Sequence, residues 1–249
     1  MTFNTQIPNA IILVEKLLKD AEWSHGSGHA RKVMTMCIDG LRYFPDITPR
    51  AQRCVILAGL LHDVDDWKLY PKHKNFENAY SILRQCDTHP HDIATIVMMI
   101  SLVSYSKNGD STIPGMPRWV YLPRDMDRLE GFSVIRSLRY TLAQGVPLSV
   151  PSDPRLKTLQ EITEYHAKNP NLAADYVSRG SGNSISMMKH YNEKLIHITV
   201  VNADIPPVAS IKARALRPLH DIMMMHGEHG YLTEDMVVGY LKDNGLYAE

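Results

Sequence analysis

The sequence has no excess of charge of either sign. Lys+Arg and Asp+Glu both total 27, so the formal net charge at neutral pH is zero. A nucleic-acid-binding protein or a membrane-surface protein normally carries a basic excess. The balance therefore argues against both kinds of partner, although it leaves room for a local basic pocket that holds a small anion.

Cysteine is scarce, and its spacing is uninformative for pairing. The chain has three cysteines, Cys37, Cys54 and Cys86. The number is odd and no CxxC motif occurs, which excludes a zinc ribbon. Free thiols in a reducing compartment are the simplest interpretation.

Long apolar runs are absent as well. No segment approaches the roughly 20 consecutive apolar residues that a transmembrane helix needs. The apolar run at 11–14 is too short for the core of a signal peptide, and the acidic Glu15 follows it directly. The sequence therefore predicts a soluble protein with a cytoplasmic location.

Strand-type alternation is rare, and a hydrophobic period of 3.6 residues dominates. Helices are predicted at 8–21, 28–44, 49–65, 74–86, 90–104, about 118–143, 155–167, 171–179, 184–200, 208–226 and 233–243. Gly, Pro, Ser and Asn are concentrated in residues 106–117, which predicts a loop. No internal repeat or low-complexity tract is present, so the sequence predicts an all-α fold.

The candidate domain boundary lies near residues 200–207, where Pro206 and Pro207 follow one another. We expect a main helical domain over residues 1–200. Residues 201–249 are then expected to form a C-terminal helical extension that packs on the same domain or makes a homodimer contact.

Two good metal ligands stand side by side at the end of a predicted apolar helix. His62 and Asp63 follow the apolar pair Leu60 and Leu61. A buried helix that ends in His-Asp places both ligands together, and the apolar residues behind them fix their position. The plainer interpretation is a polar helix end with solvated carboxylates, and the dipeptide alone does not decide between the two.

Two more candidate ligands occur on other predicted helices. His29 lies near the start of the helix at 28–44, and Asp127 lies within the helix at 118–143. Mixed imidazole and carboxylate ligation suits divalent transition metals such as Mn²⁺, Fe²⁺, Co²⁺, Ni²⁺ and Zn²⁺. Four protein ligands can also leave a position open for water and substrate, which a hydrolytic metal centre needs.

The order of these residues resembles the HD-domain metal-dependent phosphohydrolase superfamily, whose pattern is an early His, a His-Asp pair and a distant Asp. The resemblance covers about residues 20–200 and is carried by the segments 29–33, 60–68, 100–108, 124–129 and 190–195. It implies an α-helical bundle with the metal between helices. By matching position, the implied ligands of one divalent ion (Mn, Co, Ni, Fe, Zn or Mg) are His29, His62, Asp63 and Asp127.

The resemblance also implies roles for residues around the ligands. Asp66 follows Asp63 by three residues, which would place both on one face of a helix, and the family position implies that Asp66 orients water or acts as an acid or base. The alternative is a solvated acid at the helix end. Asp125 is implied to lie behind the ligands or to face the substrate.

Three cations are candidates for binding a substrate phosphate, because Lys offers a compact charge and Arg a bidentate fork. They are Lys68, Lys107 and Arg128. Each could equally be a surface cation or the partner of a neighbouring carboxylate.

The number of metal ions depends on further histidines. Some HD proteins place two more between the His-Asp pair and the last Asp, and this chain has His73, His89 and His91 there. His89 and His91 flank Pro90 in a predicted loop, away from the apolar helix that would carry a second set of ligands. We therefore expect one metal ion.

The expected activity is metal-dependent hydrolysis of a phosphate ester or anhydride in a small phosphorylated substrate, with nucleoside mono- or triphosphates as the expected class. Two alternatives stay open at this point. One is an HD-type oxygenase with two irons, and the other is a catalytically silent HD module that binds a nucleotide as a sensor.

Overall fold

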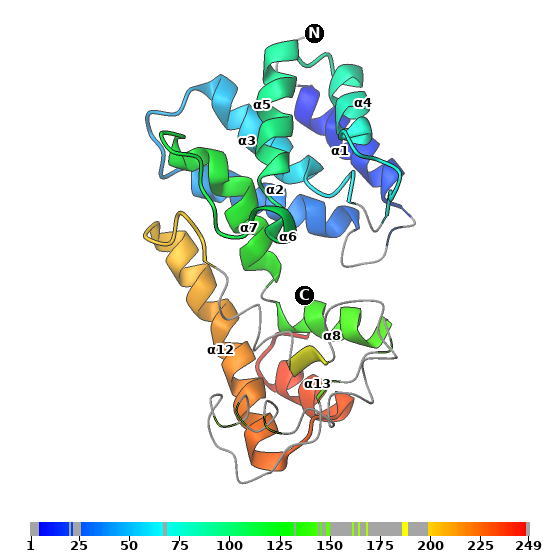
Figure 1. Ribbon diagram of the computed structural model, residues 1–249, viewed down its shortest axis with the longest axis vertical. Helices are drawn as coiled ribbons and strands as arrows, with labels where there is room; N and C mark the ends of the chain where they lie inside the picture. Colours follow the sequence, from blue (N-terminus) through cyan, green and yellow to red (C-terminus); the bar gives the residue numbers. More distant parts are fainter. Residues whose placement is uncertain are drawn as a thin grey trace. The chain divides into compact units, whose positions relative to one another are not determined.

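The computed structural model describes residues 5–19, 21, 26–66, 69–131, 133–143, 145, 148–149, 161, 164, 168, 186–188 and 199–247. Every regular element within these residues is helical (Figure 1). The all-α fold class is therefore confirmed. The helices predicted at 155–167, 171–179 and 184–200 lie largely outside the described residues.

The described elements comprise α-helices and one 3₁₀ helix. In order they are α1 (Gln6–Leu17), α2 (Ser27–Leu41), α3 (Pro49–Leu61), α4 (Glu77–Gln85), α5 (Pro90–Ser101), α6 (Tyr105–Asn108), the 3₁₀ helix η2 (Arg118–Tyr121), α7 (Leu122–Gly131), α8 (Val134–Ala143), α12 (Pro206–His229) and α13 (Glu234–Asp243).

The predicted helices within the described residues differ from the observed ones by a few residues at their ends, and two of them differ in a way that concerns the candidate site. The helix predicted at 49–65 ends at Leu61, and residues 62–65 form a turn in which both carboxylate oxygens of Asp65 accept from the amides of Asn78 and Ala79. The helix predicted at 118–143 is divided into η2, α7 and α8. Gly131 ends α7, and the Ser133 hydroxyl accepts a hydrogen bond from the amide of Arg136 (3.4 Å), which starts α8 anew.

The chain divides into two compact units. One consists of Met1–Glu130 and Thr199–Ala209, and the other of Gly131–Ile198 and Ser210–Glu249. The bounds predicted from sequence, 1–200 and 201–249, stay a prediction.

Helix α3 is the centre of the first unit and packs against α1, α2 and α5 (Figure 1). Its apolar side chains Leu57, Leu60 and Leu61 are fully buried. A Cβ on Gly59 would lie 2.8 Å from Cys37 Sγ, so glycine at this position permits the close approach of α2 and α3. His29 and His62 lie in contact, so the start of α2 is beside the end of α3.

The second unit contains α8, α13 and most of α12. Thr233 caps α13 by accepting a hydrogen bond from the amide of Met236 (3.2 Å). The Tyr240 hydroxyl donates to Asp221 Oδ2 (2.7 Å), which links α13 to α12. The last two helices predicted from sequence therefore correspond to α12 and α13.

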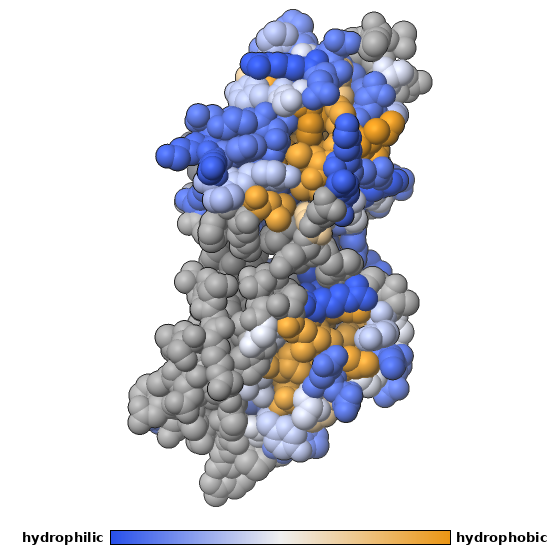
Figure 2. All heavy atoms as spheres, turned by 90° about the vertical axis from the view of Figure 1, so that its right-hand side faces the viewer, coloured by the Kyte–Doolittle hydropathy of each residue, from blue (hydrophilic) through white to orange (hydrophobic). Residues whose placement is uncertain are grey.

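Hydrophilic residues and patches of hydrophobic residues share the face of the molecule drawn in Figure 2. Among the described residues, the most exposed large apolar side chain is Ile12, at 62%. The homodimer contact expected from sequence stays a prediction, since no contact shows which surface it would cover. Within the described ranges, none of the helices is both long and apolar enough to cross a bilayer. Cys37, Cys54 and Cys86 are free and buried.

Candidate metal centre

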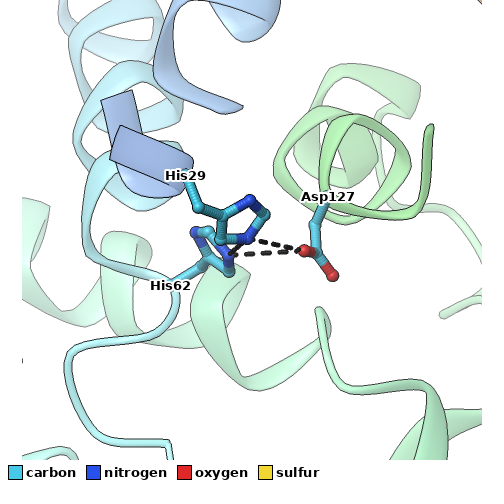
Figure 3. Close-up of side chains that lie close together, drawn as sticks. All are labelled: His29, His62 and Asp127. Carbon is cyan, nitrogen blue, oxygen red and sulfur yellow. Dashed lines mark hydrogen bonds and ion pairs between the residues drawn. The ribbon is translucent and has the colours of Figure 1, made fainter. Parts of the chain in front are cut away.

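Three side chains from three helical segments converge in the first unit (Figure 3). His29 lies in the first turn of α2, His62 is the residue that follows α3, and Asp127 lies in α7. The two Nε2 atoms are 3.0 Å apart, and Asp127 Oδ1 is 3.2 Å from His29 Nε2 and 3.4 Å from His62 Nε2. This buried group could hold a metal ion.

Asp63 brings a fourth ligand atom to the same point. Its Oδ2 lies 3.5 Å from His29 Nε2 and 3.4 Å from His62 Nε2. The structure therefore brings together all four residues that the resemblance implies as ligands. Their role as ligands stays a prediction.

The other ring nitrogen of each histidine is held by an acceptor. His62 Nδ1 is 2.8 Å from the carbonyl oxygen of Gly59, and His29 Nδ1 is 2.9 Å from Glu130 Oε2. A carbonyl oxygen can only accept, so Nδ1 of His62 carries the hydrogen, and the negative charge of Glu130 beside Nδ1 of His29 favours the same tautomer there. In a neutral imidazole the lone pair is then on Nε2.

Four electron-pair donors consequently face one point: two Nε2 lone pairs and two carboxylate oxygens. Without a positive charge between them, neighbouring lone pairs and anions repel each other in a poorly solvated place. A divalent cation satisfies all four at once, and the Nδ1 bonds are those that usually orient metal-ligating histidines. The donor set thus fits a divalent metal ion.

Titration properties agree with this charge distribution. Burial lowers the pKa of His62, but the charges of Asp63 and Asp127 and their hydrogen bonds outweigh it and raise the pKa well above its ordinary value. Burial raises the pKa of Asp127, yet hydrogen bonds from both histidines and their charges hold that pKa far below the usual range. In the absence of metal, a proton partly takes the place of the cation.

Glu130 is a functional candidate that sequence reasoning missed. Its carboxylate binds His29 Nδ1, and its side chain is 5% exposed. It follows Asp127 by three residues in α7, so a single helix turn supplies one candidate ligand and the partner of another. That spacing was a signal available in the sequence. Lys32 Nζ lies 4.0 Å from Glu130 Oε1 and partly balances its charge.

Replacing Glu130 with Ala should weaken metal binding by about 10- to 100-fold, because His29 would lose the acceptor that fixes its ring and tautomer. Glu130→Gln keeps an oxygen that accepts from Nδ1 and should lose less. Titration of Mn²⁺ into each metal-free variant by calorimetry measures this order. Equal affinity of the Ala variant and the unchanged chain would show that Glu130 does not orient His29.

Asp66 and Asp125 occupy different surroundings. Because α3 ends at Leu61, the argument that Asp66 shares a helix face with Asp63 does not hold. The two are instead joined in a turn, with the Asp66 amide donating to the Asp63 carbonyl (3.0 Å). Asp125 is fully buried and accepts from the amides of Val201 (3.0 Å) and Asn202 (2.9 Å). Burial raises the pKa of Asp125, while these hydrogen bonds act in the opposite direction.

The candidate phosphate-binding cations are not equivalent. Arg128 is buried and donates to Asp110 Oδ1 (2.7 Å), to the carbonyl of Thr199 (2.7 Å) and to the carbonyl of Gly109, so it ties two segments to α7. Lys107 is exposed in α6. Lys68 lies outside the described residues. Substrate binding by any of the three stays a prediction.

The additional histidines are engaged elsewhere within the described residues. His89 caps α5, accepting from the amide of His91 (3.2 Å), with Pro90 in the first turn. His73 donates from Nδ1 to Asp65 Oδ1 (2.8 Å), in a second group of possible ligands that includes Glu77. These positions are those of helix-end hydrogen bonds, and the expectation of one metal ion is kept.

Comparison with known proteins gives relatives without a stated activity. The chain is 33% identical over 189 residues to an uncharacterized protein of Acanthamoeba polyphaga mimivirus, with 70% of this chain and 75% of the viral protein covered. A crystal structure of a Lactobacillus plantarum protein from a structural genomics programme matches with a TM-score of 0.60 and 17% identity, covering 90% of this chain and 95% of that one. At that identity the likeness shows the fold alone. No protein-family model matches the chain.

Proposed function

The chain belongs to the same family as the uncharacterized mimivirus protein, and we propose that it is a metal-dependent phosphohydrolase of the HD type. Its proposed substrates are nucleotides, in which it cleaves a phosphate ester or anhydride bond. The observation that carries the proposal is the convergence of His29, His62, Asp63 and Asp127 as four donors directed at one point.

The exposure of the donors indicates from which side a substrate arrives. The side chains of His29 and His62 are 3% and 0% exposed, whereas those of Asp63 and Asp127 are 13% and 26% exposed. The histidines therefore form the closed floor of the site, and the two carboxylates form its solvent side. Open positions on that side are what a hydrolytic centre requires.

A divalent ion, when bound by these residues, supplies Lewis-acid activation of water and of the phosphoryl group. Asp66 is half-buried and lies one turn beyond Asp63. In this proposal its carboxylate orients the attacking water and accepts its proton. Glu130 keeps the His29 ring in place, and Asp125 acts on the fold by holding the segment at 201–202.

The charge of the substrate requires cations beyond the metal. Lys107, exposed in α6, and Lys68 are retained as the proposed phosphate contacts. The guanidinium of Arg128 already donates to three oxygens of the chain. We therefore propose a structural role for Arg128, in which it holds residues 109–110 and Thr199 against α7. Mn²⁺, Co²⁺, Ni²⁺, Fe²⁺, Zn²⁺ and Mg²⁺ all remain compatible with the proposal.

The test is release of phosphate and pyrophosphate from a panel of ribo- and deoxyribonucleotides. The metal-free protein is assayed with Mn²⁺, Co²⁺, Ni²⁺ or Mg²⁺ added separately. Asp63→Ala removes one proposed ligand. Asp39→Ala is the matched control, because Asp39 is an exposed acid of α2 whose carboxylate pairs with Arg42 (3.4 Å).

Metal-dependent release that disappears in Asp63→Ala and persists in Asp39→Ala is the expected result, and the product ratio identifies the bond that is cut. Stoichiometric metal binding without release from any nucleotide would contradict the proposal and favour the sensor alternative. Two tightly bound irons per chain would contradict it in favour of the oxygenase.

A further inference from the structure

The N-terminus of α4 lacks a cap from its own sequence. The residue at the N-cap position is Phe76, whose side chain has no hydrogen-bond acceptor, and no side-chain bond is made there. The first amides of a helix have no partner within the helix and need one from elsewhere. An oxygen that accepts from the second or third amide is the usual solution.

Asp65 supplies that cap from the turn that follows α3. Its Oδ1 accepts from the amide of Asn78 (2.9 Å), and its Oδ2 accepts from the amide of Ala79 (2.9 Å). These are the second and third residues of α4. The positive end of the helix dipole also favours a carboxylate at this place. The side chain of Asp65, which is 5% exposed, thus caps a helix that begins twelve residues later in the chain.

Two more bonds join the same turn to α4 and to the loop before it. Asn78 Nδ2 donates to the carbonyl of Val64 (2.7 Å), and His73 Nδ1 donates to Asp65 Oδ1 (2.8 Å). Val64 and Asp65 are the two residues that follow Asp63 directly. The carbonyl of Val64 and the carboxylate of Asp65 are therefore both hydrogen-bonded to the first turn of α4.

The backbone before α4 is strained in a way that fits this connection. Phe76 has φ 59° and ψ 41°, which is the left-handed region that aromatic residues rarely adopt. Such conformations persist where surrounding contacts hold them, and they concentrate at functional sites. The bonds from Asp65 to the first turn of α4 are contacts of this kind.

We propose that Asp65 and Asn78 are positioning residues that hold the turn of Asp63 against the N-terminus of α4, and so set the place of Asp63 at the metal centre. The inference rests on the proposed function, because it assumes that Asp63 binds metal. His62 needs no such support on its own side, because Gly59 already orients its ring (2.8 Å).

The group formed by Asp65, His73 and Glu77 is accordingly assigned to this connection and not to a second metal ion. Both oxygens of Asp65 already accept from backbone amides. Both oxygens of Glu77 accept from backbone amides as well, those of Lys74 (3.3 Å) and Asn75 (3.1 Å). The carboxylates of this group thus serve the entry into α4.

The experiment measures Mn²⁺ affinity by calorimetry for metal-free Asp65→Ala, Asp65→Asn and Asn78→Ala. Thr233→Ala is the matched control, because it removes the cap of α13 in the other unit. Circular dichroism gives the melting temperature of each metal-free variant. The affinities are then compared at a temperature at which all variants are folded. Asp65→Ala and Thr233→Ala should both melt earlier, since each loses a helix cap.

We expect the dissociation constant for Mn²⁺ to rise about tenfold or more in Asp65→Ala and Asn78→Ala. It should rise less in Asp65→Asn, which keeps one acceptor oxygen for α4, and stay unchanged in Thr233→Ala. Should Asp65→Ala fail to fold, Asn78→Ala decides the question by the same criterion.

Unchanged affinity in folded Asp65→Ala and Asn78→Ala would overturn the inference while leaving the proposed function intact. An equal loss of affinity in Thr233→Ala would also overturn it, because the effect would then come from general stability. If the unchanged chain fails to bind Mn²⁺, the proposed function fails first, and the inference fails with it.

Discussion

Asp127→Asn should reduce kcat/KM for metal-dependent hydrolysis by about 10³-fold, since a metal ion supplies several kcal/mol of transition-state stabilisation and about 1.4 kcal/mol corresponds to a factor of ten. The substitution keeps the shape of the side chain and removes its charge. Asp127 Oδ1 is within 3.4 Å of both Nε2 atoms, so the lost charge belongs to the centre itself.

The measurement is kcat/KM at several metal concentrations, together with the melting temperature of the metal-free variant. Asp204→Asn is the control, because Asp204 is a carboxylate of the same unit that pairs with Arg118 at the surface. Activity of Asp127→Asn within a few-fold of the unchanged chain would show that Asp127 does not bind the metal.

Metal binding should tighten as pH rises from 6 to 8, by up to about 100-fold. The pKa of His62 is raised well above its ordinary value, since the charges of Asp63 and Asp127 outweigh burial. The proton on His62 must leave before the metal can bind. Each proton released makes the affinity about tenfold stronger per pH unit below that pKa.

The stability of the metal-free protein should decrease as pH rises from 6 to 8, whereas metal binding tightens. A raised folded-state pKa means that the contribution of charged His62 is complete below the unfolded-state value of about 6.5 and is lost as pH rises through the folded-state value. The pKa of Asp127 is lowered, so its contribution is present above about pH 4 and is lost only as pH falls through its folded-state value. The contribution of Asp127 to the stability of the metal-free protein therefore does not change between pH 6 and 8.

Melting temperatures with and without saturating Mn²⁺ at pH 6, 7 and 8 measure both effects together. The gap between the two melting temperatures should widen with pH. A gap that stays constant or narrows would mean that no histidine proton competes with the metal.

The features that depend on residue type and on the helical period, namely the fold class and the grouping of the four candidate ligands, could be predicted from the sequence. The all-α fold followed from the 3.6-residue period. The approach of His29, His62, Asp63 and Asp127 was expected from the resemblance in their order along the chain, and the distances in the structure agree with that expectation.

The features that sequence did not predict depend on contacts between distant segments. The end of α3 at Leu61 accompanies the use of Asp65 by a helix that starts at Glu77. The burial of Asp125 under Asn202 arises from a segment 77 residues away. No local pattern reports such pairings, because they depend on how helices pack.

Arg128 is a further residue whose contacts could not be predicted from the sequence. Sequence placed it next to Asp127 and so suggested a phosphate contact. Adjacent residues of a helix face different directions, and the guanidinium donates to Asp110 and to the carbonyl of Thr199, two contacts that the sequence did not predict. The direction of each side chain around α7 became known only with the neighbouring segments in place.

The most direct test of the metal centre is an anomalous difference map from a crystal of the protein grown with Mn²⁺. One peak per chain is predicted at bonding distance, about 2 Å, from the Nε2 atoms of His29 and His62 and from carboxylate oxygens of Asp63 and Asp127. A map with no peak between these four residues, or with its peak at Asp65, His73 and Glu77, would contradict the account.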